Sequence, residues 1–325
     1  MKALLCKQFG LPESLVLEEI DSPVLGAREV RIAVRAAGLN FADTLMIAGL
    51  YQLKPPLPFS PGMEIAGVVV EVGPGVTRVR KGDRVMATCF FGGFAEERCV
   101  SEDTVLPILD EVSFVTAAAL PITYGTTYHA LTDRADLKPG EWLLAHAAGS
   151  GVGLNAVELG KLLGARVIAC SSSVEKLALA KSYGAEETID YSREKIRDRV
   201  LTITEGRGAD VIFDPVGGDV FDESLRCIAW EGRLLVVGFA GGRIQMVPGN
   251  QVLLKECQIV GVNTGQYLKH KIEEYRDRLS DIVRWTAAGK LRPHISATYR
   301  LDEAPLAIAA IGARSVVGKI VITVP

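Results

Sequence analysis

The chain has 325 residues, of which 48% are hydrophobic and 23% charged, and its formal net charge at pH 7 is −3. A chain of this length predicts two domains, and its near-average composition excludes an extended disordered protein. The slightly negative net charge, without any run of basic residues, argues against a nucleic acid or an anionic membrane as the partner. We therefore expect a small-molecule ligand.

The start of the chain and its cysteines favour a cytoplasmic protein. The apolar stretch at residues 3–6 ends at Lys7 and is too short for a secretory signal. No segment reaches the length of a membrane-spanning helix, so we expect no membrane partner. The six cysteines show no CxxC pair or other close spacing typical of a zinc knuckle or redox motif, which favours reduced thiols.

The first part of the chain, up to about residue 120, predicts a compact β-rich domain. Val30, Ile32 and Val34 alternate with less apolar residues, as in a half-buried antiparallel strand. Further strands are expected at residues 65–72 and 84–87, the second of which follows a Lys-Gly-Asp turn.

From about residue 124 the pattern changes to strands that alternate with helices, which predicts a parallel sheet covered on both faces. Its strands are expected at residues 142–146, 166–170, 187–191, 210–213, 233–239 and 258–262. After an amphipathic helix that ends before Gly289, the segments at residues 295–300, 302–311 and 319–324 break this pattern. We expect them to rejoin the first domain. The predicted domains are therefore residues 1–122 with 265–325, and an inserted cofactor domain at residues 123–264.

The segment HAAGSGVG, residues 146–153, follows a predicted strand and opens a helix predicted over residues 152–163. Gly149, Gly151 and Gly153 permit a sharp turn and let backbone amides approach a pyrophosphate, whose charge is favoured at a helix N-terminus. Ser150 and Val152 are expected in the same site. A tight turn chosen only for packing is the alternative.

The end of the second predicted parallel strand indicates which dinucleotide binds. An NAD site normally has an acidic side chain there, whereas this chain has Ser171 and Ser172. Hydroxyl groups leave room for a 2′-phosphate, and Lys176 could supply a positive charge, although an exposed lysine needs no special role. We therefore expect NADPH rather than NADH.

Taken together, these segments resemble the zinc-free quinone oxidoreductase branch of the medium-chain dehydrogenase/reductase superfamily. The resemblance runs from Met1 to the C-terminus and rests on MKALLCKQFG, GLNFAD (residues 38–43), GLY (49–51), PGME (61–64), KGDRV (81–85), the glycine loop and DPVGG (214–218). Ser150 replaces a glycine that is more common in the family. The resemblance implies a Rossmann doubly wound parallel sheet inserted into a GroES-like β-rich catalytic domain. It also implies a homodimer that pairs sheet edges at residues 258–262.

The same resemblance implies residues for the cofactor site. Lys176, Tyr191 and Arg314 would hold the 2′-phosphate, with the serines nearby, because ammonium, guanidinium and phenol groups are suitable partners for a phosphate. A surface role for Arg314 is the alternative. Near the nicotinamide the resemblance implies Thr127, Phe239 and Asn263.

Zinc-dependent members of the superfamily carry a cysteine where this chain has Asn40 and a histidine where it has Met63. An amide and a thioether do not form the thiolate and imidazole shell of zinc, so we expect no metal. Without a metal the hydride acceptor must already be conjugated, as in a quinone or an enone. Hydrogen-bond donors at its oxygen would stabilise the transition state, and Asn40 and Tyr51 are the candidates. A turn role for Asn40 and a pocket-wall role for Tyr51 are the alternatives.

These inferences predict an enzyme that uses NADPH to transfer hydride to a quinone. Reduction of an activated C=C bond, in an enone, an acrylate or an enoyl thioester, is the closest alternative. A non-catalytic NADPH-binding protein is a second one. The sequence does not separate a quinone from an enone as the substrate, nor does it identify the physiological acceptor.

Overall fold

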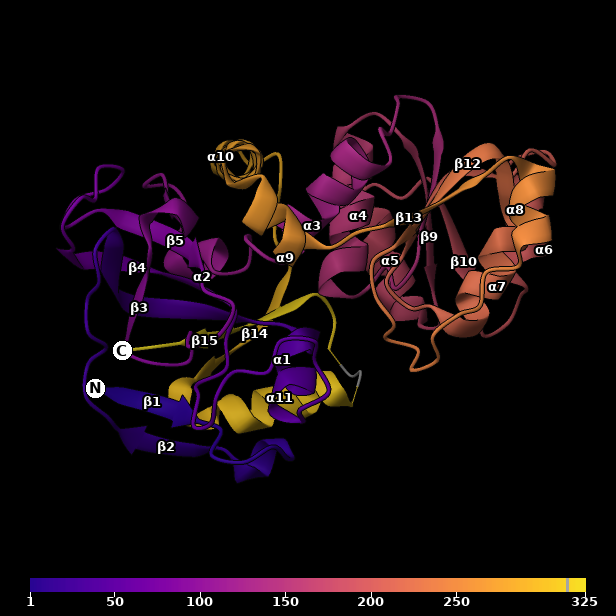
Figure 1. Cartoon of the computed structure of the whole chain (residues 1–325). Coiled ribbons are helices and arrows are strands. Elements are labelled where there is room, and N and C mark those ends of the chain that lie inside the picture. Colours follow the sequence, from indigo (N-terminus) through magenta and orange to yellow (C-terminus); the bar gives the residue numbers. More distant parts are fainter. Residues whose placement is uncertain (314–315) are drawn as a thin grey trace. The chain divides into compact units, whose positions relative to one another are not determined.

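The computed structural model describes residues 1–313 and 316–325, which form two compact units (Figure 1). Unit 1 comprises Met1–Ile122 and Leu268–Pro325, and unit 2 comprises Thr123–Tyr267. The two ends of the chain therefore fold together, and the segment between them forms a unit of its own. The second boundary lies after Tyr267 rather than after the predicted residue 264.

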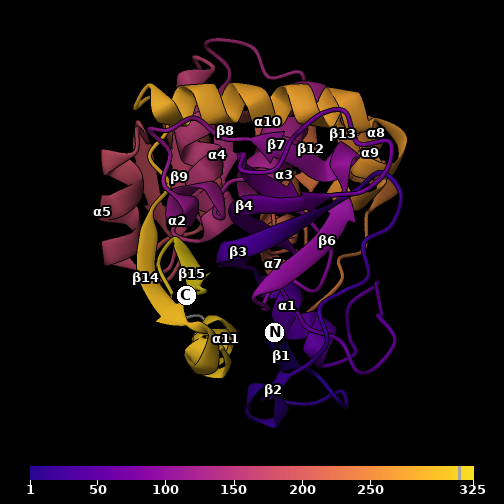
Figure 2. The same cartoon turned by 90° about the vertical axis from the view of Figure 1, so that its left-hand side faces the viewer.

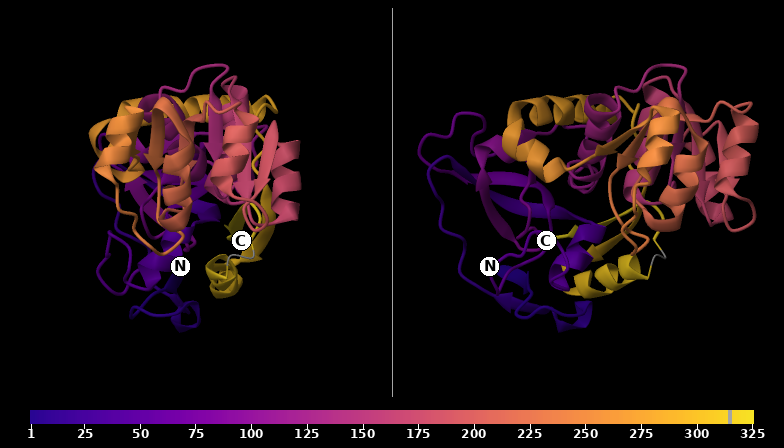
Figure 3. Two further views of the ribbon diagram at one scale, coloured as in Figure 1. Left: turned by 90° about the vertical axis from the view of Figure 1, so that its right-hand side faces the viewer. Right: turned by 45° about the vertical axis from the view of Figure 1, so that its right-hand side comes forward.

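Unit 2 contains a six-stranded parallel sheet in the order β10-β9-β8-β11-β12-β13. The strands are β8 (Trp142–Ala145), β9 (Arg166–Ser171), β10 (Glu187–Asp190), β11 (Ala209–Asp214), β12 (Ile228–Val236) and β13 (Gln258–Gly261). The helices of this unit are α3 (Thr123–His129), α4 (Gly151–Leu162), α5 (Val174–Ser182), α6 (Ile196–Ile203), α7 (Gly218–Cys227) and α8 (Gly249–Lys255), with the start of α9 (Thr264–His270). In Figure 1, α3, α4 and α5 cover one face of the sheet, and α6, α7 and α8 cover the other. Figure 3 shows this sheet from two further directions. The doubly wound sheet expected from the sequence is confirmed.

The central strands of this sheet are largely buried because helices cover both faces. All six residues of β11, for example, are buried. Strand β12 differs from the prediction because Ile228 already pairs with Ala209, and the next paired residue is Arg233. The intervening residues form a β-bulge, with Glu231 in the left-handed region at φ 57°. The strand therefore begins earlier than the apolar run indicates.

Unit 1 is built on a seven-stranded sheet in the order β14-β15-β3-β4-β5-β7, with β6 paired to β3. Its strands are β3 (Glu29–Leu39), β4 (Glu64–Val72), β5 (Arg84–Thr88), β6 (Glu97–Ser101), β7 (Val105–Pro107), β14 (Ile295–Arg300) and β15 (Lys319–Thr323). A separate antiparallel pair comprises β1 (Lys2–Leu5) and β2 (Val16–Glu19). Strand β15 pairs antiparallel with β3, so the end of the chain completes a sheet begun near its start (Figure 2). This β-rich domain with an inserted parallel sheet confirms the predicted fold class.

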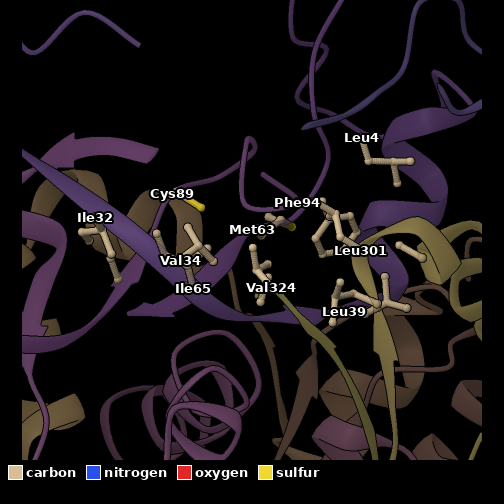
Figure 4. Packing of buried hydrophobic residues seen from close by; sticks show 14 of the residues in the cluster. Leu4, Ile32, Val34, Leu39, Met63, Ile65, Cys89, Phe94, Leu301 and Val324 are labelled. Atoms are coloured by element: carbon tan, nitrogen blue, oxygen red, sulfur yellow. The ribbon is translucent and has the colours of Figure 1, made fainter. Parts of the chain in front are cut away.

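The helices of unit 1 are α1 (Phe41–Ile47), α2 (Phe114–Ala117), α10 (Ile272–Ala287) and α11 (Ala304–Gly312). Helix α10 is amphipathic as predicted, since Tyr275, Leu279 and Ile282 are buried along one side. The core of unit 1 is a cluster of apolar side chains contributed by segments far apart in the sequence, including Leu4, Leu39, Met63, Ile65, Phe94, Leu301 and Val324 (Figure 4). Within the described residues, no helix is both long and apolar enough to span a bilayer.

Candidate functional site

The glycine-rich loop joins β8 to α4, and Ser150 is the N-cap of that helix. Its Oγ accepts a hydrogen bond from the Gly153 amide (3.2 Å). A Cβ on Gly153 would lie 2.1 Å from the Ala147 carbonyl oxygen, so only glycine allows this close approach. Ser150 is therefore a helix cap as well as a loop residue, a role that a family comparison alone does not indicate.

The loop also contains an alanine in a glycine-like conformation. Ala147 has φ 52°, and its carbonyl accepts a hydrogen bond from the Ser150 amide (2.7 Å). The next residue, Ala148, donates its amide to Cys170 at the end of β9 (3.1 Å). These contacts fix the loop between two strand ends, where the first-turn amides of α4 are the type of donor that binds anions at helix N-termini.

Lys176 lies directly against this loop. A Cβ on Gly149 would fall 2.4 Å from Lys176 Cγ and 2.5 Å from its Cβ, so the stem of the lysine packs on the glycine. Helix α5, which carries Lys176, is capped by Ser173, whose Oγ accepts from the Lys176 backbone amide (3.4 Å). The half-buried Lys176 is thus held beside the glycine loop rather than extended freely into solvent.

Strands β9 and β10 end side by side and bring the remaining phosphate candidates together. Asp190 pairs with Ser171, and the Tyr191 amide donates to the Ser171 carbonyl (3.2 Å). Ser171 is buried, whereas Ser172 and the Tyr191 side chain are exposed. The fourth candidate of this group, Arg314, lies outside the described residues.

The sequence pattern does not indicate that a carboxylate, Asp190, lies at the end of β10 beside these candidates. Asp190 accepts hydrogen bonds from the amide and hydroxyl of Ser192, at 3.0 and 2.6 Å. The Ser192 hydroxyl contributes most to lowering the pKa of Asp190 below its ordinary value. Arg193 Nε lies 3.5 Å from the same carboxyl group. Asp190 is therefore a partly neutralised anion close to Tyr191.

The residues expected near the nicotinamide differ in their exposure. Phe239 is 46% exposed, and Gly217 approaches its ring closely enough that a Cβ there would lie 3.5 Å from Cδ1. Asn263 is exposed, and its Oδ1 accepts from the Gln266 amide (3.0 Å) at the start of α9.

Thr127 requires a correction. It is fully buried, its hydroxyl donates to the Thr123 carbonyl (2.8 Å), and the same oxygen lies 3.3 Å from the Val152 carbonyl. Helix α3 packs against α4, so Thr127 supports the first turn of α4 instead of presenting its hydroxyl to a ligand.

In unit 1, Asn40 is the N-cap of α1, and its surroundings are strongly polar although it is only 6% exposed. The backbone N–H of Asn40 donates to Asp43 Oδ2 (2.8 Å), and Asp43 Oδ1 accepts from the backbone N–H of Gly62 (3.0 Å). Burial is the main reason why the pKa of the Asp43 carboxyl is raised to about 7.

The Asn40 side chain is held by two charged residues. Its Nδ2 donates to Glu64 Oε1 (2.8 Å), and its Oδ1 accepts from Lys319 Nζ (2.6 Å). Lys319 also donates to Glu64 Oε1 (2.6 Å) and to the Leu39 carbonyl (2.9 Å). The Asn40 side-chain amide is therefore not freely available to a ligand, although the sequence led us to expect that it would be. One of its two N–H groups already donates a hydrogen bond to Glu64.

Tyr51 is half-buried against the core of unit 1. Burial raises the pKa of its phenol above the ordinary value, the Gln52 side chain opposes this shift, and the Asp43 charge adds to it. The phenol is therefore protonated near neutral pH and can donate a hydrogen bond. Met63, by contrast, packs in the apolar core (Figure 4). Over residues 1–313 and 316–325, no three His, Cys, Asp or Glu side chains form a group arranged to hold a metal.

The comparisons with known proteins agree with this architecture. Residues 26–110 match the family described as alcohol dehydrogenase GroES-like domain, and residues 151–282 match the family described as zinc-binding dehydrogenase. The chain is 45% identical over 325 residues to the quinone oxidoreductase-like protein 2 homolog of Nematostella vectensis, with 99% of this chain and 88% of that protein covered.

Two solved structures are similar over nearly the whole chain. The quinone oxidoreductase of Pseudomonas syringae pv. Tomato has a TM-score of 0.93 at 35% identity, with 99% of each chain covered. The Escherichia coli quinone oxidoreductase complexed with NADPH has a TM-score of 0.92 at 28% identity, covering 99% of this chain and 100% of that one.

A GroES-like unit with an inserted Rossmann unit and a glycine loop at the first strand-to-helix turn defines a medium-chain dehydrogenase/reductase. Within that superfamily the chain belongs to the quinone oxidoreductase family, and it is therefore a member of an enzyme family.

Proposed function

We propose that this protein is an NADPH-dependent reductase that transfers hydride to a quinone without a metal. The observation that carries the proposal is the position of Lys176 against Gly149. This position places a cation next to the glycine loop of a Rossmann sheet. The helix that carries the cation also contacts β9 and β10, whose ends adjoin. The E. coli relative is complexed with NADPH, which supports the same cofactor here.

The residues of unit 2 fit a phosphorylated dinucleotide. The first-turn amides of α4 at Gly151 and Val152 would receive the pyrophosphate, while Ser150 caps the Gly153 amide. Lys176, Ser172 and Tyr191 would bind the 2′-phosphate, and the absence of a carboxylate at Ser171 removes the group that selects NAD. Phe239 and Asn263, both exposed, would lie along the nicotinamide half.

NADPH, when bound, supplies the hydride. The chain must then stabilise the negative charge that gathers on the acceptor oxygen, and it must hold a proton for it. The protonated Tyr51 phenol would donate that proton or hold the water that does. The Asn40 amide would give a second hydrogen bond.

Independence from a metal is supported by the residues around Asn40. Zinc needs anionic or imidazole ligands, whereas the Asn40 Oδ1 already accepts from the Lys319 ammonium at 2.6 Å. Treatment with a chelator should therefore leave turnover unchanged, and the purified enzyme should contain less than stoichiometric zinc. Loss of activity on chelation, with recovery on addition of zinc, would contradict this part of the proposal.

A homodimer is also part of the proposal. Strand β13 lies at the end of its sheet, and α8, which precedes it, exposes Leu253 and Leu254 at 75% and 77%. Within the described residues no strand pairs with the outer edge of β13, and such an edge, with exposed leucines in the preceding helix, is suited to pairing with a second copy. Light scattering after gel filtration should give twice the mass of one chain, and a monomer would contradict pairing at this edge.

The proposed activity is tested by steady-state oxidation of NADPH with matched acceptors. The panel contains a benzoquinone, a naphthoquinone, a small enone and an enoyl thioester. The proposal predicts the highest kcat/KM with a quinone. A strong preference for the thioester or the enone would favour C=C reduction instead. Binding of NADPH without turnover of any acceptor would favour the non-catalytic alternative.

A further inference from the structure

A buried pair of charged side chains contacts the Asn40 amide from two sides. Glu64 is fully buried and Lys319 is 5% exposed, and their oxygen and nitrogen lie 2.6 Å apart. Lys319 is the first residue of β15, whereas Asn40 follows β3, with which β15 pairs. The C-terminal strand therefore brings an ammonium group to the start of α1.

The two partners fix the orientation of the amide. An ammonium group can only donate hydrogen bonds, and an ionised carboxylate can only accept them. Because Lys319 Nζ faces Asn40 Oδ1 and Glu64 Oε1 faces Nδ2, a rotation by 180° about the last side-chain bond would place donor against donor and acceptor against acceptor. The charged pair thus permits one of the two amide orientations.

The network is closed on its other sides. Glu64 Oε2 accepts from the Ile122 amide (2.8 Å), and Lys319 donates to the Leu39 carbonyl (2.9 Å). A Cβ on Gly38 would lie 2.4 Å from Glu64 Oε1 and 2.2 Å from the Ala118 carbonyl, so the Gly38 backbone packs closely against one side of the carboxylate. The Glu64–Lys319 pair is held rigidly with respect to Asn40.

One hydrogen of the amide remains weakly engaged. Asn40 Nδ2 donates to Glu64 at 2.8 Å, but it reaches the Gly38 carbonyl only at 3.4 Å, which is long for an N–H···O bond. A better acceptor, such as the carbonyl oxygen of an electron-accepting substrate, would take this hydrogen. The charged pair also polarises the amide, since a cation lies at its oxygen and an anion at its nitrogen.

We infer that Lys319 and Glu64 are positioning residues, which orient the Asn40 amide so that its second N–H is aimed at the substrate oxygen. The inference rests on the proposed reductase activity. It assigns to the last strand of the chain a part in turnover, at residues that do not themselves touch substrate or cofactor.

The experiment is a double-mutant cycle on kcat, with the NADPH Kd and the melting temperature measured for every variant. Asn40→Ala and Lys319→Met should each lower kcat by about 10- to 100-fold, and the NADPH Kd should stay within about twofold. The double variant should lose no more than the worse single variant, because Lys319 acts through Asn40. Lys319→Arg keeps the charge and should retain kcat within about fivefold. Lys290→Met removes an exposed lysine of the same unit and should match the parent enzyme.

Lys319→Met leaves the Glu64 carboxylate unpaired in the interior and is the variant at risk of unfolding. The combined variant Glu64→Gln/Lys319→Met removes both charges and keeps an amide that can donate or accept. Its melting temperature should equal that of the parent enzyme, but its kcat should still be lower, because neither orientation of the Asn40 side-chain amide is then excluded.

Parent-like kcat in the charge-free variant, or losses that multiply in the Asn40→Ala/Lys319→Met double variant, would overturn the inference. Parent-like kcat in Asn40→Ala would also overturn it, while turnover by the parent enzyme leaves the proposed activity standing. Failure of the parent enzyme to oxidise NADPH with any acceptor would instead contradict the proposed function itself.

Discussion

The side chain of Lys176 packs on Gly149, where an added Cβ would lie 2.4 Å from Lys176 Cγ. A cation on α5 is thereby tied to the loop that precedes α4. Gly149→Ala should displace the stem of the lysine, because its Cβ and Cγ cannot move as freely as its ammonium end. The NADPH Kd should rise about tenfold or more, which fluorescence titration measures. An unchanged Kd would show that the position of Lys176 does not matter for NADPH.

Lys176 itself should determine the choice of dinucleotide. Lys176→Met keeps most of the side-chain length and removes the charge that would face a 2′-phosphate. The Kd for NADPH should rise about 10- to 100-fold, whereas the Kd for NADH, which lacks that phosphate, should change less than about twofold. Equal weakening for both dinucleotides would mean that the lysine acts on the loop and not on the phosphate.

Ala147 offers a stabilising substitution within the same loop. At φ 52° an alanine is strained and a glycine is not, so Ala147→Gly should raise the free energy of unfolding by roughly 0.5–1 kcal/mol. Ala156→Gly, in the middle of α4, should lower it by about 1 kcal/mol or more as a matched control. Urea unfolding followed by circular dichroism measures both. Destabilisation by Ala147→Gly would contradict the assigned loop conformation.

The N-cap hydrogen bond of Ser150 can be tested separately. Ser150→Ala removes the acceptor of the Gly153 amide and should lower the free energy of unfolding by about 1 kcal/mol, whereas Ser150→Gly should lower it by only a few tenths. The same urea experiments decide this. Equal effects of the two substitutions would argue against a capping hydroxyl.

The raised pKa of Asp43 leads to a prediction of how the free energy of unfolding depends on pH. Burial raises the pKa of its carboxyl from 3.8 to about 7 in the folded protein, so the folded state binds more protons than the unfolded state between these values. Its contribution to stability is therefore complete below about pH 4 and is lost as the pH rises through about 7. Urea unfolding at pH 5, 6, 7 and 8 should show the contribution of this group falling, and Asp43→Asn should flatten that part of the profile. A profile with the same slope in Asp43→Asn would assign the proton to another group.

The parts of the fold that depend on local pattern could be predicted from the sequence. The glycine loop, the amphipathic helix at Ile272–Ala287 and the alternation of strands and helices in unit 2 each follow from residues that are close in the chain. The serines at the end of β9 could be located for the same reason, since they directly follow an apolar run.

Other features depend on contacts between distant residues and carry no local signal. Lys319 reaches Asn40 only because β15 pairs with β3, a pairing that no periodicity reveals. The burial of Thr127 follows from the packing of α3 on α4, and a threonine in that segment could equally face a ligand. The left-handed conformation of Ala147 is hidden because alanine normally avoids it.

We propose above all that the glycine loop of unit 2, with Lys176 beside it, selects a phosphorylated dinucleotide. Parallel titrations of the unmodified protein with NADPH and with NADH test it most directly. Both reduced dinucleotides should bind saturably, with a Kd for NADPH at least about tenfold lower than that for NADH. Equal affinities, a preference for NADH or no binding of either would contradict it.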